Sequence, residues 1–130
     1  MKNDWIDPYL LALPGCAKDY KAEWEWQRYQ VGCKMFAATM QPGSQYAPEY
    51  AGRRLLSLKC DPAWSEQLRG QHPDILPGFY ADKRCWISID LDGAVPEDLL
   101  RELCDHSYNL VFAKLTKKLQ SEISEQADGS

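Results

Sequence analysis

Residues 53–64 read RRLLSLKCDPAW and join a predicted strand directly to a predicted helix. Leucines alternate with other residues in the first half, which predicts a half-buried strand over 53–60. Asp61 then supplies a helix N-cap, and Pro62 occupies the first helical position, so a helix is predicted over 63–70. A strand that leads straight into a helix indicates a mixed α and β domain.

Period-two patterns predict further strands on both sides of this unit. They cover residues 20–29, 33–40 and 85–92. The segment 41–52 holds two prolines, two glycines and a serine, which predicts a long loop. In the last of these strands the alternation directs the isoleucines inward and Trp86 outward.

Helix signals lie at both ends of the chain. Asp7 and Pro8 predict the start of a short helix, which the LPG sequence at 13–15 ends. A longer helix is predicted over 96–119. It begins at Pro96, and apolar residues recur along it at spacings of three, four and seven. A bend near Ser107 is expected within it.

The fold class that follows is α+β, in the order α-β-β-β-α-β-α. Short connections between the early strands favour an antiparallel sheet, and the helices are expected to cover one face of it in a two-layer domain. We expect a single domain over residues 1–119. A polar C-terminal tail, frayed at its end, is expected over 120–130.

The charge balance limits the classes of function. The 130 residues include 15 Lys+Arg and 19 Asp+Glu, a formal net charge of −4. Proteins dedicated to nucleic acid usually carry a basic excess, so only a local basic surface could serve that purpose here. No apolar run approaches the roughly 20 residues that cross a bilayer, and the start lacks a signal-peptide pattern. We therefore expect a cytoplasmic protein without a membrane partner.

No residue pattern indicates catalysis or a cofactor. The five cysteines include no Cys-x₂₋₄-Cys pair, which argues against a zinc site and favours small buried side chains. His72 and His106 are not accompanied by a nucleophile signature, and no glycine-rich phosphate loop is present. The acids of the last helix, Glu97, Asp98, Glu102 and Asp105, are typical of a solvated face rather than a metal site. We expect a protein that is not an enzyme, without cofactor or metal.

A basic surface on the sheet is the first candidate binding site. Lys34 and Lys59 lie on predicted strands, while Lys83 and Arg84 lead into the strand that carries Trp86. If the sheet brings them together, the four cations would contact phosphates and the indole would contact a base or the groove wall. In the alternative, the cations are separate solvated charges and Trp86 is half-buried packing.

An aromatic surface is the second candidate. Trp24, Trp26 and Trp86, with the tyrosines of 46–50, could line an open face of the sheet for a small aromatic molecule or a protein partner. In the alternative, Trp24 and Trp26 pack under the last helix, as alternating aromatics in a half-buried strand commonly do.

The chain resembles the MmcQ/YjbR family of small bacterial proteins over residues 10–119. The matching pieces occur in family order: LPG at 13–15, GCKMFA at 32–37, LKCDP at 58–62, ILPG at 75–78, DKRCWIS at 82–88, LDG at 91–93 and SYNLV at 107–111. The resemblance implies a frataxin-like (CyaY-like) fold and a role in binding double-stranded DNA through a double-wing surface. Two features depart from the family pattern: Cys85 stands where a histidine is frequent, and the loop over 41–52 is longer.

Overall fold

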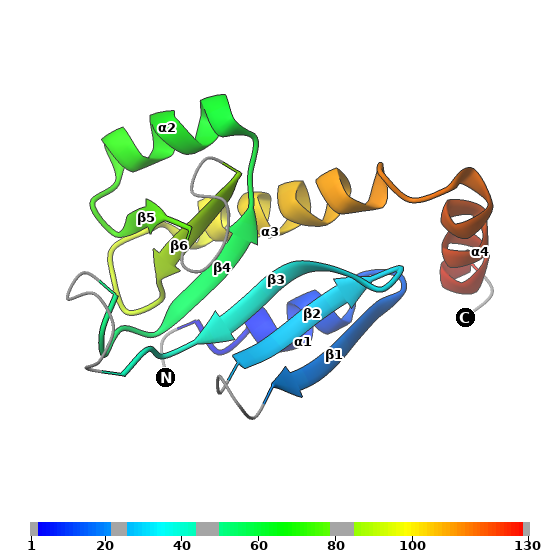
Figure 1. Ribbon diagram of the computed structural model, residues 1–130, viewed down its shortest axis with the longest axis horizontal. Helices are drawn as coiled ribbons and strands as arrows, with labels where there is room; N and C mark the ends of the chain where they lie inside the picture. Colours follow the sequence, from blue (N-terminus) through cyan, green and yellow to red (C-terminus); the bar gives the residue numbers. More distant parts are fainter. Residues whose placement is uncertain (1–2, 22–25, 44–49, 79–84, 129–130) are drawn as a thin grey trace.

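A single six-stranded sheet organises the described part of the computed structural model, which comprises residues 3–21, 26–43, 50–78 and 85–128. Every neighbouring pair of strands is antiparallel, in the spatial order β1-β2-β3-β4-β6-β5. Figure 1 shows this sheet as the layer nearest the viewer. The strands are β1 (Cys16–Lys21), β2 (Trp26–Val31), β3 (Lys34–Met40), β4 (Leu55–Lys59), β5 (Ile75–Pro77) and β6 (Trp86–Asp90).

Four helices complete the described fold: α1 (Ile6–Leu11), α2 (Pro62–Gln71), α3 (Glu97–Phe112) and α4 (Lys117–Asp128). In Figure 1, α1 and α3 lie behind the sheet, and α4 follows α3 at one end of the molecule. All four helices contribute buried side chains to one apolar cluster, among them Leu10, Leu68, Leu103 and Ile123. This cluster packs on one face of the sheet, so the expected two-layer α+β arrangement is confirmed.

The opposite face of the sheet has its own small core. Trp26, Ala38, Met40 and Leu55 are buried there together with Tyr50, which precedes β4. No helical residue belongs to this second cluster. Among the described residues, the core on this face is therefore built from side chains of strands and a loop, without a helix.

A bulge in β3 lets two consecutive side chains enter the main core. Tyr29 of β2 pairs with Ala37 and Gln30 pairs with Met35, so Phe36 is the extra residue. Both Phe36 and Ala37 are fully buried in the main cluster. Strict alternation over 33–40 would have placed them on opposite faces.

The order of elements differs from the predicted α-β-β-β-α-β-α in three places. The predicted strand over 20–29 is wrong in extent, because β1 and β2 are separate paired strands. The three-residue β5 was not predicted, since a run this short carries no period. The last helical pattern divides into α3 and α4 at residues 113–116, not near Ser107.

Two helix boundaries show which sequence signals were decisive. Asp61 caps α2 as predicted, because its side chain accepts the backbone N–H of Ala63 at 3.0 Å. Asp7 does not cap α1, which begins one residue earlier at Ile6. The Asp7 carboxylate accepts hydrogen bonds from Lys18 and Tyr29 instead.

The C-terminal segment is helical where a frayed tail was expected. The expected boundary at residue 120 lies inside α4, which continues to Asp128. Ile123 of this helix is buried and belongs to the main core. Across the described residues, none of the helices combines the length and apolar character needed to cross a membrane.

Candidate nucleic-acid interface

Three lysines converge where β3 begins and β4 ends. Lys34 is the first residue of β3, Lys59 is the last of β4, and Lys114 follows the C-terminal end of α3. The pKa of Lys59 is lowered, first by its partial burial and then by the neighbouring ammonium groups of Lys114 and Lys34. We call these three residues the lysine cluster. None of them forms an ion pair with a carboxylate of the described residues.

A buried serine positions this end of the sheet against α3. The ladder between β3 and β4 ends with the pair Ala37 and Leu58. Beyond it, the Ser107 hydroxyl accepts the backbone N–H of Lys59 at 2.9 Å and donates to the carbonyl of Phe36. The helix is thereby fixed across both strands, and its C-terminal end carries Lys114 toward Lys59.

Trp86 lies directly beside the lysine cluster. It is the cross-strand partner of Lys59 in the β4–β6 pair and is half-buried. The pairing of the two chain segments continues one residue beyond, where the backbone N–H of Cys60 donates to the carbonyl of Cys85 at 2.8 Å. The structure therefore brings Lys34, Lys59 and Trp86 to one end of the sheet. Lys83 and Arg84, the other predicted contacts, lie outside the described residues.

Lys114 belongs to this group but was missed in the sequence. Its position relative to the strands depends on where the last helix ends, and the bend was expected near Ser107 instead of after Phe112. One sequence signal could have pointed to Lys114. A lysine just after a helix is favourable there, because it compensates the negative C-terminal end of the helix dipole.

Five other cations of the described chain pair with carboxylates. Arg53 and Arg54, at the opposite end of β4 from Lys59, pair with Asp90 at 3.6 Å and Asp92 at 2.7 Å. Three further ion pairs are Lys18–Asp7, Arg28–Asp19 and Arg101–Glu97. The lysine cluster differs from these five cations because its members lie near one another and have no carboxylate partner among the described residues.

His106, Cys60 and Cys104 have structural environments. His106 Nε2 accepts the backbone N–H of Asp61 at 3.2 Å, and the ring meets Trp64 edge-on at 4.6 Å between centroids. Burial lowers the pKa of His106 and raises the pKa of the thiols of Cys60 and Cys104 to about 11 and about 12. These thiols remain protonated at neutral pH and are poor nucleophiles.

The acids of the last predicted helix do not assemble into a metal site within the described residues. Glu97 pairs with Arg101 one turn later on α3. Asp105 accepts a hydrogen bond from the Tyr9 hydroxyl at 2.7 Å, which raises the pKa of Tyr9 to about 12. These carboxylates stabilise the α1–α3 contact and the surface of α3.

The aromatic residues of the second candidate surface are largely interior. Trp26 and Tyr50 are 9% and 4% exposed, and the Tyr50 hydroxyl donates to the carbonyl of Pro77 at 3.0 Å. Trp26 packs on the sheet face away from the helices, so the expectation that it lies under the last helix is wrong. Trp24 and Tyr46 lie outside the described residues.

Comparison with known proteins identifies the family. A family model described as YjbR matches residues 11–110. The chain belongs to the YjbR family. YjbR of Escherichia coli (strain K12) is 31% identical to this YjbR-family chain over 100 residues, which cover 77% of the chain and 78% of that protein. YyaQ of Bacillus subtilis (strain 168) is 43% identical over 56 residues, 43% of the chain and 47% of YyaQ.

Solved structures share the fold of this YjbR-family chain. The crystal structure of Deinococcus radiodurans protein DR2400 superposes with a TM-score of 0.78 at 33% identity, covering 95% of the chain and 88% of DR2400. A crystal structure from Pseudomonas syringae gives a TM-score of 0.71 at 20% identity, over 85% of the chain and 99% of that protein. The second likeness concerns the fold alone.

Proposed function

We propose that the lysine cluster binds the phosphates of double-stranded DNA and that the chain is a DNA-binding module without catalytic activity. The observation that carries this proposal is the convergence of Lys34, Lys59 and Lys114 with no carboxylate partner among the described residues. Neighbouring like charges raise the free energy of the empty site. An anion that neutralises them lowers it.

Phosphate is the anion that suits this arrangement best. Lysine ammonium groups are compact point charges that bind phosphate oxygens without demanding the planar geometry of a carboxylate. The cluster also lies at an open end of the sheet, where Lys34 and Lys114 are exposed. A long polyanion can reach several ammonium groups there at once.

Trp86 supports a nucleic acid over a free phosphate ion. A half-buried indole beside phosphate-binding lysines can contact a base edge or the wall of a groove. Lys83 and Arg84 precede this strand in the sequence, and the proposal includes them as further phosphate contacts. The family resemblance implies a DNA-binding role with the same chemistry. We propose with it a frataxin-like fold and a cytoplasmic location.

A binding role is supported over catalysis by the environments of His106, Cys60 and Cys104. The His106 imidazole is engaged with Asp61, and the Cys60 and Cys104 thiols are buried with raised pKa values. The alternative of an aromatic ligand on the open sheet face has less support. Trp26 and Tyr50, which would form that face, are already buried in a core.

Fluorescence anisotropy with a labelled mixed-sequence duplex tests this proposal. At low salt the wild-type chain should bind, and binding should weaken steeply near physiological salt. Replacing Lys59 and Lys34 together by Glu should abolish the interaction, whereas K117E/K118E on exposed positions of α4 should retain at least part of it. Equal affinities of the two double variants would exclude the lysine cluster as the site.

A further inference from the structure

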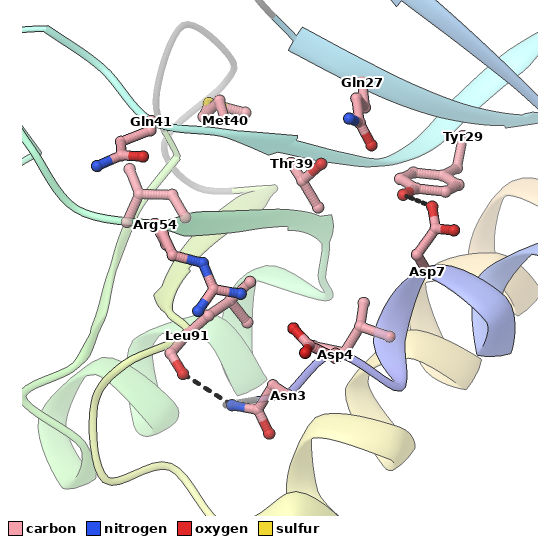
Figure 2. A pocket seen from close by; sticks show the side chains of 12 residues that line it. Asn3, Asp4, Asp7, Gln27, Tyr29, Thr39, Met40, Gln41, Arg54 and Leu91 are labelled. Carbon is pink, nitrogen blue, oxygen red and sulfur yellow. Dashed lines mark hydrogen bonds between the residues drawn. The ribbon is translucent and has the colours of Figure 1, made fainter. Parts of the chain in front are cut away.

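A separate cavity of about 330 Å³ lies at the other end of the central strands. Figure 2 shows it between the N-terminal segment with α1 and the strands β2, β3 and β4. Its volume is at the lower end of the range of ligand pockets, which suits a molecule with few heavy atoms. The polar side chains that matter to its chemistry are Asn3, Asp4, Asp7, Gln27, Thr39 and Arg54.

Two ionised groups at this cavity, Asp7 and Arg54, are already engaged within the protein. Asp7 accepts hydrogen bonds from Lys18 at 2.6 Å and from the Tyr29 hydroxyl. Arg54 donates to Asp92 at 2.7 Å. A charged ligand would compete with these pairs and would lose its own hydration as well. A neutral ligand leaves these pairs intact, and its hydroxyls cost less to desolvate than a charge does.

The same groups retain hydrogen-bonding capacity for a neutral molecule. A carboxylate has about four acceptor sites, and a guanidinium has five N–H donors. The amide of Gln27 offers donors and an acceptor on the strand side of the cavity, and the hydroxyl of Thr39, which interacts with Tyr29, keeps an acceptor there. Figure 2 shows these side chains on the sheet wall, opposite Asp4 and Asp7. Hydroxyl groups, which donate and accept together, match such a mixed wall.

The apolar part of the cavity is aliphatic. Ile6, Leu55 and Leu91 are among its lining residues, and each is at most 5% exposed. Tyr29 is the aromatic residue of the described lining, but its ring is fully buried and its hydroxyl is bound to Asp7. The wall can therefore pack against the C–H groups of a saturated ring, and it offers no aromatic face for stacking.

We infer that this cavity binds a neutral polyhydroxylated molecule of monosaccharide size. Its hydroxyls bridge the carboxylate of Asp4, the amide of Gln27 and the guanidinium of Arg54, and its C–H face lies on the aliphatic side chains. The site is independent of the lysine cluster, because it is formed by the opposite ends of β3 and β4.

NMR titration of the ¹⁵N-labelled chain tests the inference. The probes are D-glucose, D-galactose, D-mannose, D-ribose and myo-inositol, each compared with glucose 6-phosphate and glucosamine as charged analogues. At least one neutral probe should give saturable amide shifts confined to the cavity and should bind more tightly than its charged analogue. Preferential binding of the charged analogues would overturn the ligand class, and no saturable shift with any probe would overturn the site.

Matched variants then locate the ligand. Gln27→Ala and Asp4→Asn change exposed positions on the cavity rim and should weaken binding at least tenfold. Gln67→Ala changes an exposed glutamine of α2 outside the cavity and should bind as the wild type does. Each variant is first shown to be folded by its amide spectrum. Shifts that persist unchanged in both cavity variants would contradict the assignment.

Discussion

The hydroxyl of Ser107 on α3 takes the position of a missing sheet hydrogen bond at Lys59. It accepts the Lys59 N–H at 2.9 Å and donates to the carbonyl of Phe36, where the β3 bulge ends the ladder. Ser107 is fully buried, so water cannot substitute for it. One side chain therefore connects the helix, two strands and the backbone of a proposed ligand-binding residue.

Removing this hydroxyl should destabilise the protein. Ser107→Val leaves a buried N–H and a buried carbonyl without their partner, which costs about 1–3 kcal/mol for each such group. Urea unfolding should show a lower midpoint for S107V than for the wild type. Ser121→Ala, at an exposed position of α4, serves as the control and should leave the midpoint unchanged. A neutral S107V would show that the bridge contributes nothing to stability.

Replacing Lys59 should stabilise the empty protein while it weakens DNA binding. Lys59→Gln relieves repulsion from Lys114 and Lys34, and the gain should resemble the cost of like-charge pairs on a helix surface, which is about 0.2–0.5 kcal/mol. The gain in unfolding free energy should appear at low salt and shrink at high salt, because salt screens the repulsion. Lys118→Gln, on an exposed surface of α4, should show no such gain. A salt-independent loss of stability in K59Q would contradict the repulsive arrangement.

His106 should make stability depend on pH on the acidic side of neutrality. Burial lowers its pKa from the ordinary value of 6.5, so the folded state favours the neutral imidazole that accepts from Asp61. The contribution is fully present above pH 6.5 and is lost as pH falls toward and through the lower folded pKa. His106→Gln should flatten the slope of unfolding free energy against pH in this window. Parallel slopes for H106Q and the wild type would refute the role of this histidine.

Two glycines should respond in opposite directions to alanine. Gly32 has φ +56°, and an added Cβ would lie 2.7 Å from a Leu115 methyl, so Gly32→Ala should cost about 1–2 kcal/mol through backbone strain and repacking. Gly70 lies in α2 with nothing within 4 Å of an added Cβ. Gly70→Ala should stabilise by about 0.5–1 kcal/mol through its helix propensity. Thermal unfolding of both variants checks the two signs together.

The fold class was predictable because its strongest signals are local. Alternating leucines before an Asp-Pro helix start identified β4 and α2 almost to the residue. The separation of β1 from β2 and the short β5 were not predictable, because edge strands are defined by their partners more than by a pattern of their own. The position of the break after Phe112 depends on tertiary packing of Ile123 against the core, which the helical period does not reveal.

The candidate site was predictable in part. Strand alternation placed Lys59 and Trp86 on strand surfaces, and the structure makes them direct cross-strand partners. Lys114 was missed, because its approach to Lys59 depends on the bulge at Phe36 and on the Ser107 bridge. The cavity lined by Asp4 and Arg54 was also beyond prediction, since it joins segments far apart in the sequence.

The most direct test of the central claim is the salt dependence of duplex binding. Log affinity should fall with log salt by about 0.9 for each phosphate neutralised. The double variant Lys34→Gln/Lys59→Gln should therefore reduce the wild-type slope by about 1.8. Lys18→Gln/Arg53→Gln removes the same charge from cations that already pair with Asp7 and Asp90, and it should leave the slope unchanged. Equal slopes for the two variants, or no binding by the wild type at low salt, would contradict the account.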